Sequence, residues 1–300
     1  MKNHSEEFQG TLYAIFAFTF WGLAPIYFKA VAHVSPTEVL VHRIIWSVVL
    51  LFILIFIAKQ TKTFILTIQN KEKLKILFLS ALLVSTNWLI FIWAVGNSKI
   101  TEASLGYYIN PLVNVFLGMI FFGERLNKIQ IISIFLAFLA ILYELIALGK
   151  IPYISLALAF SFGFYGLARK KANIPSITGL FIETLLITPL AIAYLVYLFY
   201  IGENSFTFSI NFTSLLLILA GLITVIPLLW FNSAATRISM FKLGFLQYIG
   251  PSISFLLAIF IYKEPFNEEK LYTFILIWIA LVLFTFSDLK KFQTVKKSSK

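Results

Sequence analysis

The sequence predicts an all-α integral membrane protein with ten transmembrane helices, arranged as two inverted five-helix repeats. Three observations predict this fold. Of the 300 residues, 60% are apolar and 12% are charged, and the mean hydropathy of +0.92 lies far outside the range of soluble domains. Apolar segments of membrane-spanning length recur along the whole chain. A pattern of polar residues also occurs twice, 140 residues apart.

Each predicted span is an apolar stretch of about 20 residues, the length that crosses a hydrocarbon core about 30 Å thick as a helix. The ten spans cover residues 10–30, 37–58, 75–97, 103–122, 128–148, 151–169, 176–200, 213–235, 241–262 and 271–288. Residues 1–9 form a polar N-terminus, and residues 289–300 form a basic tail. An even number of spans places both ends on one side of the membrane.

Lysines and arginines lie mostly on the side that carries the two termini. Eighteen fall on that side, five fall on the opposite side, and Arg43 lies within a span. Such a bias marks the cytoplasmic side of the membrane. We therefore interpret the net charge of +11 as an orientation signal and a lipid-facing rim, and we expect the bilayer, not nucleic acid, as the partner of these charges.

The repeated pattern is a Tyr-x-x-Pro followed by a Glu-x-x-Asn, with thirteen residues from the proline to the glutamate. The first copy runs from Tyr108 to Asn127 and the second from Tyr248 to Asn267. The pattern divides the chain into repeats of residues 10–148 and 151–288, with five spans each. Because five is odd, equivalent spans cross in opposite directions, so the repeat is inverted. Such halves with prolines at matching depths are typical of secondary transporters.

Residue types that carry most enzyme chemistry are scarce. Cysteine is absent, Asp288 is the one aspartate, and the histidines are His4, His33 and His42. These absences exclude thiolate nucleophiles and cysteine-ligated metals, and the sequence has no G-x-x-x-x-G-K-[ST] phosphate loop. We therefore expect neither an enzyme nor a bound metal or other cofactor.

Prolines fall within five predicted spans, where each removes a backbone donor and frees a carbonyl. They are Pro25, Pro111, Pro189, Pro227 and Pro251. A freed carbonyl in hydrocarbon is tolerated only against protein or a wet cavity. We interpret the matched Pro111 and Pro251 as kinks that line a central pathway. The alternative for any single proline is a packing kink between neighbouring helices.

Polar and aromatic side chains cluster near the depth of these prolines. They are Asn87, Trp88, Tyr107, Tyr108, Asn110, Asn114, Tyr165, Gln247 and Tyr248. At spacings of three and four, Tyr107, Asn110 and Asn114 share one helical face. Aromatics with amides can form a pocket for amphipathic or cationic small molecules. The alternative is hydrogen bonding between helices.

Charged residues within spans are expensive to insert and mark functional sites. Arg43 and Glu183 occupy nearly equivalent positions of spans 2 and 7, so we expect them to form an ion pair, or to alternate between partners, across the interface of the halves. The alternative is that each snorkels or caps a backbone carbonyl. His42 is a candidate for coupling because its charge changes near neutral pH. Glu102 is a candidate gate or proton-handling carboxylate, or else a solvated helix end.

Two glutamates end the repeat-related spans 4 and 9. Glu124 and Glu264 lie on opposite faces of the predicted fold. Their recurrence predicts a structural or gating role at each mouth, with local pairing to Arg125 and Lys263.

Several motifs resemble those of the RarD-type permeases, which belong to the EamA branch of the drug/metabolite transporter superfamily. The resemblance covers essentially the whole chain. Its motifs in this sequence are Trp21-Gly22-Leu23-Ala24-Pro25, His42-Arg43-x-x-Trp46-Ser47, Asn87-Trp88-x-x-Phe91, Gly106-Tyr107-x-Ile109-Asn110-Pro111, Phe164-Tyr165-Gly166-Leu167, Ile182-Glu183-Thr184 and Gln247-Tyr248-Ile249-Gly250-Pro251.

The resemblance implies a ten-helix carrier of the bacterial inner membrane with inverted repeats and both termini cytoplasmic. In related carriers spans 1, 3, 4, 6, 8 and 9 line the central cavity, which adds Trp21 to the candidates above. In these carriers spans 5 and 10 are peripheral, and the resemblance implies that they form the contact of a homodimer. The RarD type is associated by name with chloramphenicol sensitivity, and relatives export amino acids, drugs and other small metabolites.

Together these features predict a secondary permease, acting as an exporter, that moves a small metabolite or drug such as an amino acid or a chloramphenicol-like compound by alternating access. One alternative is a non-transporting membrane scaffold or sensor subunit, which has no need of matched kinks or of polar residues within spans. A second is a membrane-embedded enzyme that modifies lipids, which would normally need clustered Asp, His or Cys.

Overall fold

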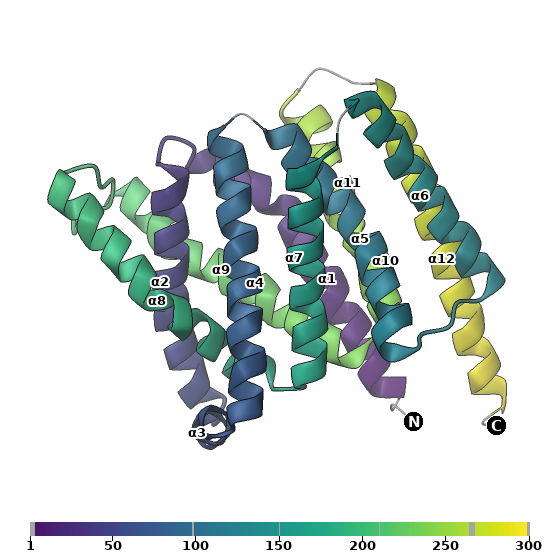
Figure 1. Ribbon diagram of the computed structural model, residues 1–300, viewed down its shortest axis with the longest axis horizontal. Helices are drawn as coiled ribbons and strands as arrows, with labels where there is room; N and C mark the ends of the chain where they lie inside the picture. Colours follow the sequence, from purple (N-terminus) through teal and green to yellow (C-terminus); the bar gives the residue numbers. More distant parts are fainter. Residues whose placement is uncertain (1–3, 98, 150, 210, 264–267, 299–300) are drawn as a thin grey trace.

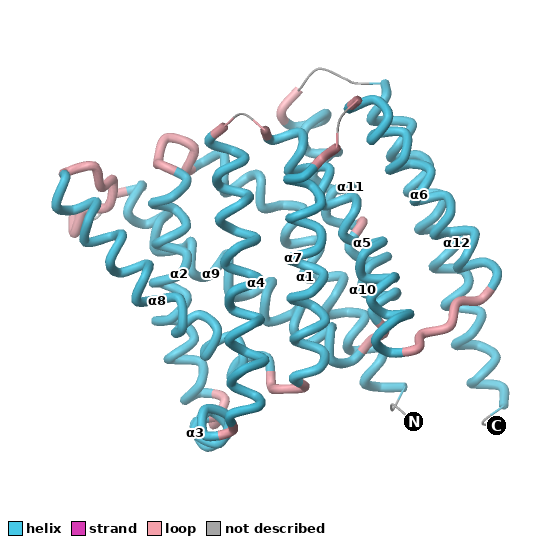
Figure 2. The backbone as a smooth tube through the Cα atoms, in the orientation of Figure 1, coloured by secondary structure: helices cyan, strands magenta, loops and turns pink. Residues whose placement is uncertain are grey.

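The computed structural model describes residues 4–97, 99–149, 151–209, 211–263 and 268–298. Within these ranges the ordered elements are all helices. The long helices lie side by side in one bundle, and the two ends of the chain lie at the same end of it (Figure 1). The connections between them are short loops at the two ends of the bundle (Figure 2).

Most helix bounds follow the predicted spans to within a few residues. Helix α1 begins six residues before the first predicted span, and α12 extends ten residues beyond the last, into the predicted basic tail. The elements are α1 (His4–Ala30), α2 (Pro36–Ile57), α3 (Thr61–Gln69), α4 (Lys71–Gly96), α5 (Ile100–Phe122), α6 (Lys128–Leu148), α7 (Tyr153–Ala172), α8 (Ser176–Ile201), α9 (Phe212–Arg237), α10 (Met240–Gln247), α11 (Ile249–Leu256), a π-helical turn (Leu257–Ile261) and α12 (Glu268–Ser298). The short helix α3 lies in a segment that the sequence predicted only as a polar connection.

In the part of the chain that the structure describes, eight segments are helical, long and apolar enough to cross a membrane. They are α1, α2, α4, α5, α6, α8, α9 and the segment Met240–Ile261. The apolar part of α12, Leu271–Ser287, is shorter, and α7 ends in the basic run Arg169, Lys170 and Lys171. The multi-pass membrane architecture therefore follows from length and composition.

The matched prolines have different effects on their helices. Pro251 lies in the segment where the chain changes from α10 to α11 at Tyr248 and ends in a π-helical turn. Proline has no N–H to donate to the carbonyl four residues before it, and its ring crowds that carbonyl. The interruption at Tyr248 is therefore where the missing bond is expected. Pro111 lies inside α5, which continues from Ile100 to Phe122.

The first Glu-x-x-Asn copy marks a helix boundary. Helix α5 ends at Gly123, whose φ of 60° is left-handed and so favours glycine. Helix α6 begins with a reciprocal capping box, in which the Asn127 side chain accepts from the Gln130 N–H and the Gln130 side chain accepts from the Asn127 N–H. This exchange satisfies two donors at the start of α6.

Helix packing pairs elements from the two halves of the chain. Helix α1 packs on α9 and α11, while α7 packs on α4 and α5. Three further pairs join helices at equivalent places in the two halves: α2 with α8, α5 with α10, and α6 with α12. The α6–α12 pair forms one edge of the bundle (Figure 1).

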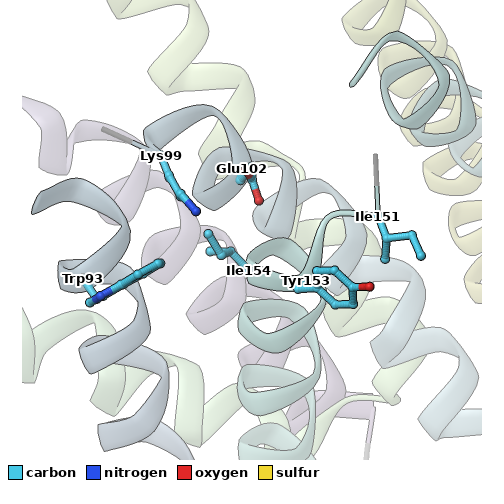
Figure 3. A pocket seen from close by; sticks show the side chains of 6 residues that line it. All are labelled: Trp93, Lys99, Glu102, Ile151, Tyr153 and Ile154. Atoms are coloured by element: carbon cyan, nitrogen blue, oxygen red, sulfur yellow. The ribbon is translucent and has the colours of Figure 1, made fainter. Parts of the chain in front are cut away.

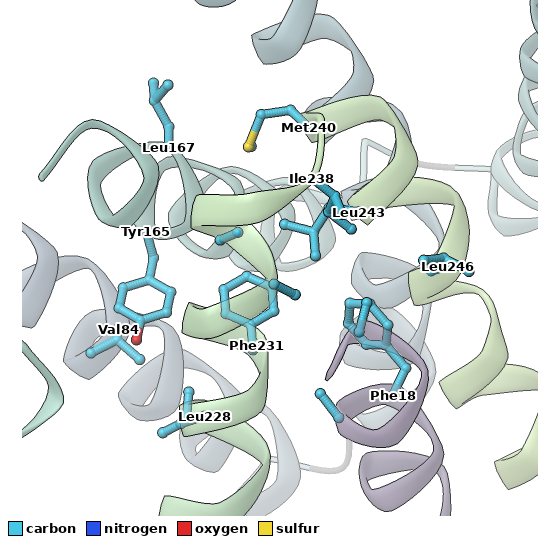
Figure 4. Packing of buried hydrophobic residues seen from close by; sticks show 14 of the residues in the cluster. Phe18, Val84, Tyr165, Leu167, Leu228, Phe231, Ile238, Met240, Leu243 and Leu246 are labelled. Atoms are coloured by element: carbon cyan, nitrogen blue, oxygen red, sulfur yellow. The ribbon is translucent and has the colours of Figure 1, made fainter. Parts of the chain in front are cut away.

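Aromatic side chains fill the core where α1, α7 and α9 meet (Figure 4). Phe231 stacks on Tyr165 at 5.9 Å between ring centroids and meets the edge of Phe18 at 6.2 Å. All three side chains are fully buried. A second cluster joins α10 to α12 through the stacked rings of Phe245 and Phe284, 4.3 Å apart.

Close approach of α2 and α9 generates a stability prediction. A Cβ added at Gly221 would lie 2.5 Å from the carbonyl carbon of Trp46 and 2.8 Å from the amide nitrogen of Ser47. We expect Gly221→Ala to lower the unfolding free energy by about 1–3 kcal/mol, as overpacking does, measured as a lower Tm of the detergent-purified protein.

The matched control is Gly166, also within a helix, where an added Cβ meets its nearest atom at 3.4 Å. Gly166→Ala should leave the Tm unchanged or raise it, because alanine favours helix by about 1 kcal/mol over glycine. Equal Tm values for the two variants would contradict a backbone contact at Gly221.

Candidate functional site

A chain of amides joins three helices at the depth of Pro111. The Asn114 Nδ2 donates to the Asn110 Oδ1 at 3.2 Å and to the Gln247 Oε1 at 3.0 Å. The Asn110 Nδ2 in turn donates to the carbonyl oxygen of Ala159 at 2.5 Å. All three amide side chains are buried. They therefore link α5, α7 and α10. For these three amides the structure shows hydrogen bonding between helices, which the sequence analysis gave as the alternative to a solute pocket.

Tyr108 and Tyr248, which hold the same place in the two copies of the repeated pattern, lie against each other. The Tyr248 hydroxyl donates to the carbonyl oxygen of Tyr108 at 3.2 Å. Tyr248 is fully buried, whereas Tyr108 is half-buried and meets Phe274 of α12 at 5.5 Å between ring centroids. This contact places the repeat-related segments next to each other.

Asn87 also bonds between helices. Its Nδ2 donates to the carbonyl oxygen of Leu158 and to the Ser161 Oγ, both at 2.9 Å, and ties α4 to α7. Trp21 packs among the core aromatics, 5.8 Å from both Phe162 and Phe231. Neither side chain is placed by these contacts in an open pocket.

Glu183 lies at the centre of a buried polar network that joins four helices. Its carboxylate accepts a hydrogen bond from Ser80 of α4, contacts the Arg169 guanidinium of α7 at 3.4 Å, and accepts from the Tyr165 hydroxyl at 3.4 Å. The same hydroxyl lies 3.1 Å from the Asn232 Oδ1 of α9. Arg169 and Glu183 are both fully buried.

The predicted ion pair between Arg43 and Glu183 is therefore wrong. Glu183 pairs with Arg169, whose guanidinium occupies space that a side chain at Gly179 would fill. The sequence predicts Arg169 at the basic cytoplasmic end of its span, whereas the structure buries its side chain fully in the last turn of α7. One signal was available: Arg169 lies four residues after Tyr165, on the same helical face.

Arg43 has a different environment, which we call the Arg43 centre. Its Nε donates to the Thr224 Oγ1 of α9 at 2.9 Å. Its guanidinium carbon lies 5.0 Å from the Trp88 ring centroid and 5.7 Å from that of Phe28. The hydroxyls of Tyr27 and Tyr107 lie within electrostatic range. The centre is defined by Arg43, Tyr27, Phe28, Trp88, Tyr107 and Thr224, which come from α1, α2, α4, α5 and α9.

His42 faces away from that centre and towards the loop between α8 and α9. Its Nδ1 accepts from the Trp46 Nε1 at 3.2 Å, and its Nε2 lies 3.9 Å from a Glu38 carboxylate oxygen. The same Glu38 oxygen accepts from the backbone N–H groups of Ser205 and Phe206, at 2.7 and 3.2 Å. The group therefore holds the α8–α9 loop against α2.

Glu124 caps a helix of the other half. Its two carboxylate oxygens accept from the N–H groups of Met240 and Phe241 at 2.8 and 3.0 Å. These are the first donors of α10, where a negative charge is favoured by the helix dipole. The structure thus gives Glu124 a structural role in place of the expected pairing with Arg125. Glu264 lies outside the described residues.

Glu102 lines an open pocket where α4, α5 and α7 end, of about 590 Å³. Figure 3 shows Trp93 and Lys99 on one side of this pocket and Ile154 and Tyr153 on the other. Glu102 is buried, and its backbone carbonyl accepts from the Ser155 Oγ at 2.5 Å. Among the described residues, no group of three or more His, Cys, Asp or Glu side chains is placed to hold a metal ion.

Comparison with known proteins identifies the family. The model of the EamA-like transporter family matches residues 8–145. The protein RarD of Escherichia coli K12 is 45% identical over 298 residues, which cover 97% of this chain and 98% of RarD. The chain belongs to the EamA-like transporter family. It is a RarD-type member and therefore a membrane transporter, not an enzyme.

Other relatives agree with this assignment. An uncharacterized transporter of Vibrio cholerae is 46% identical over 97% of this chain and 96% of its own. The chloramphenicol-sensitive protein RarD of Pseudomonas aeruginosa is 30% identical over 92% of this chain and 93% of its own. At the level of fold, a solved crystal structure superposes with a TM-score of 0.71 at 16% identity, covering 91% of this chain and 96% of the other.

The Arg169–Glu183 pair of this EamA-like transporter generates the second prediction. Removing one partner leaves an uncompensated buried charge, which costs about 3–5 kcal/mol. We expect Arg169→Met and Glu183→Met each to lower the Tm of the purified protein strongly. The double variant should be far more stable than the sum of the two losses predicts, because no unpaired charge remains.

A double-mutant cycle on thermal unfolding measures this coupling. Tyr165→Phe is the matched control, since it removes one hydrogen bond to Glu183 without leaving a charge unpaired. Additive losses in the cycle would contradict the ion pair.

Proposed function

We propose that this transporter is a secondary carrier that moves a small organic solute across the bacterial inner membrane by alternating access. In this proposal ten helices cross the bilayer. The eight long apolar segments are joined by α7 and by the apolar part of α12. The two repeats are residues 10–148 and 151–288, with residues 1–9 and 289–300 outside the bilayer.

The pattern of helix packing supports an inverted repeat. Exchanging the halves turns the pair α1–α9 into α7–α4, and it turns α1–α11 into α7–α5; all four pairs are closely packed. The same exchange maps α2–α8, α5–α10 and α6–α12 onto themselves. A packing pattern that survives the exchange of halves is what a pseudo-two-fold axis produces.

The observation that carries the proposal is the contact between Tyr248 and Tyr108. Equivalent residues of two repeats touch only near the axis that relates them. Beside this contact, the interruption before Pro251 and the amides Asn114 and Gln247 collect polar groups inside the bundle. Substrate sites of such carriers lie near the midplane at the interface of the repeats.

The candidate substrate residues divide into two roles in this proposal. The buried amides and tyrosines hold the helices of the two repeats together near the axis. The Arg43 centre holds groups that a solute can reach, because Arg43, Trp88 and Tyr107 are half-buried or exposed. Helix kinks at Pro25, Pro111, Pro227 and Pro251 are expected to accommodate the rearrangement.

The name of the Pseudomonas aeruginosa relative refers to chloramphenicol, so we propose an amino acid or a chloramphenicol-like compound as the solute, moved outward. The excess of basic residues at the end that carries both termini supports a cytoplasmic location for them. The proposed dimer contact falls on α6 and α12, at one edge of the bundle (Figure 1).

Orientation generates the third prediction. The chain has no cysteine, so single cysteines report on accessibility without background. Gln69→Cys lies at the end of α3, and Ser209→Cys lies in the loop between α8 and α9. In intact cells we expect a membrane-impermeant maleimide to label Ser209→Cys, and to label Gln69→Cys only after permeabilisation. The reverse pattern would place both termini outside.

Alternating access generates the fourth prediction. Two hydrogen bonds join the halves near opposite ends of the bundle: His33 with Thr213 at 2.9 Å, and Thr178 with Gln60 at 2.8 Å. If one half rocks against the other, a disulfide at either place stops the cycle. We expect oxidised His33→Cys/Thr213→Cys and Gln60→Cys/Thr178→Cys proteins to lose solute counterflow in proteoliposomes, and reductant to restore it.

The matched control is Ser176→Cys/Ser233→Cys, at 2.8 Å within the second half, which should transport in both redox states. Radiolabelled chloramphenicol, phenylalanine and benzoate serve as the solutes. Flux that persists through both cross-links would contradict rocking of the halves. No flux of any solute in the unmodified protein would favour the scaffold or sensor alternative.

A further inference from the structure

Arg43, within α2, and Arg169, in the last turn of α7, differ in one respect. Arg169 lies 3.4 Å from the Glu183 carboxylate. Arg43 has no such counter-ion: among the described residues its contacts are Thr224 and two aromatic rings, with the hydroxyls of Tyr27 and Tyr107 nearby. A cation inside a membrane protein without a charged partner is costly and marks an ion or substrate pathway.

The position of Arg43 excludes a simple escape to the bilayer surface. It lies seven residues after Pro36, the first residue of α2, so its Cα is about 10 Å from the helix start at 1.5 Å per residue. Its Nε is held by Thr224 on α9, which directs the guanidinium into the bundle. Ser47 lies one turn further along α2, and its Oγ contacts the carbonyl oxygen of Gly221, which is also on α9.

The rings around Arg43 fix the guanidinium without neutralising it. Trp88 and Phe28 lie within 6 Å of it from two different helices, a distance at which a ring face attracts a cation. Among the described residues the hydrogen bond of the guanidinium is the one from its Nε to Thr224, so the edge that carries its two terminal nitrogens is left for another acceptor. That edge is the fork that matches a carboxylate bidentately.

Tyr107 is the exposed member of the Arg43 centre. It lies on α5, the most buried of the eight long apolar segments, yet 42% of its surface is exposed. Helix α5 packs mainly on α7 and α10, whereas α2 packs mainly on α8 and α9. The Tyr107 hydroxyl is nevertheless close enough to Arg43 to interact with its charge, so α5 also contributes to the Arg43 centre.

We propose that the Arg43 centre binds the carboxylate of the transported solute, with the apolar part of that solute against Trp88 and Phe28. The inference rests on the proposed carrier function and names the chemical class of its solute. A single guanidinium with one edge free matches one monoanion. A phosphate dianion would need further cations, and among the described residues no contact of Arg43 is with a second basic residue.

The solute class proposed here, a carboxylate with an apolar part, differs from the class that the amides and aromatics predict from the sequence. That class was amphipathic or cationic small molecules. A cationic solute would meet like charge at Arg43. An aromatic or branched-chain carboxylate satisfies both the charge and the rings, and zwitterionic amino acids fall within the same class.

The test compares benzoate with benzamide, which has the same ring without the charge, and with inorganic phosphate. Each is titrated onto the full-length protein in detergent at constant ionic strength, and the Tm is recorded. A ligand that binds the folded state raises Tm with the logarithm of its concentration once it exceeds the dissociation constant. We expect benzoate to raise the Tm, and benzamide and phosphate to leave it unchanged.

Variants assign the effect to the centre. Arg43→Gln should abolish the benzoate-dependent rise and Arg43→Lys should weaken it, because a lysine keeps the charge but loses the fork. If Arg43→Gln does not fold, Thr224→Val tests the same geometry, since it removes only the bond that orients the guanidinium. Arg237→Gln is the matched control: Arg237 also lies beside a ring, that of Tyr13, at 5.6 Å, and its loss should leave the rise intact.

Each outcome decides the inference. A rise with benzoate that is lost in Arg43→Gln or Thr224→Val and kept in Arg237→Gln supports it. Equal rises with benzamide or phosphate, a rise that survives Arg43→Gln, or no rise with benzoate overturns it. Counterflow separates this result from the carrier proposal: transport of chloramphenicol without benzoate binding would overturn the solute class alone, and benzoate binding without any flux would overturn the carrier alone.

Discussion

The hydrocarbon core of a bilayer offers no hydrogen-bond partner, so backbone polar groups within the spans must be satisfied inside the protein, and polar side chains there gain by bonding between helices. Apolar side chains cannot specify which helices meet, because lipid tails are as apolar as they are. The buried amides and the Glu183 network therefore carry much of the specificity of this bundle. Asn110 and Asn114 tie α5 to α7 and α10, and Glu183 ties α8 to α4 and α7.

The same constraint makes Arg43 and Arg169 informative as a pair. Both lie within helices of a membrane protein, and in the part of the chain that the structure describes only Arg169 has a carboxylate beside it. A buried ion pair is an adequate account of Arg169, since each charge compensates the other. Arg43 needs a different account, which a solute that brings its own negative charge supplies.

The repeated Glu-x-x-Asn pattern has a direct physical meaning in its first copy. Glu124 accepts from the first N–H groups of α10, and Asn127 caps α6. The two residues follow the end of α5. Asn127 caps the start of α6, and Glu124 caps the start of α10 in the second half of the chain. In this first copy the pattern therefore marks helix termini that must be capped.

The sequence by itself determined where the helices lie, because apolar length and the punctuation by proline, glycine and asparagine act locally. It also indicated the family, since motifs such as Tyr248-Ile249-Gly250-Pro251 are local. Only the tertiary structure decided the partners: Glu183 meets Arg169 and not Arg43, and Asn87, Asn110 and Asn114 bond between helices. The physical reason is that a helix carries side chains all around its axis. Neither hydropathy nor spacing says which face meets which neighbour, so contacts between distant segments follow from the packing of the whole bundle.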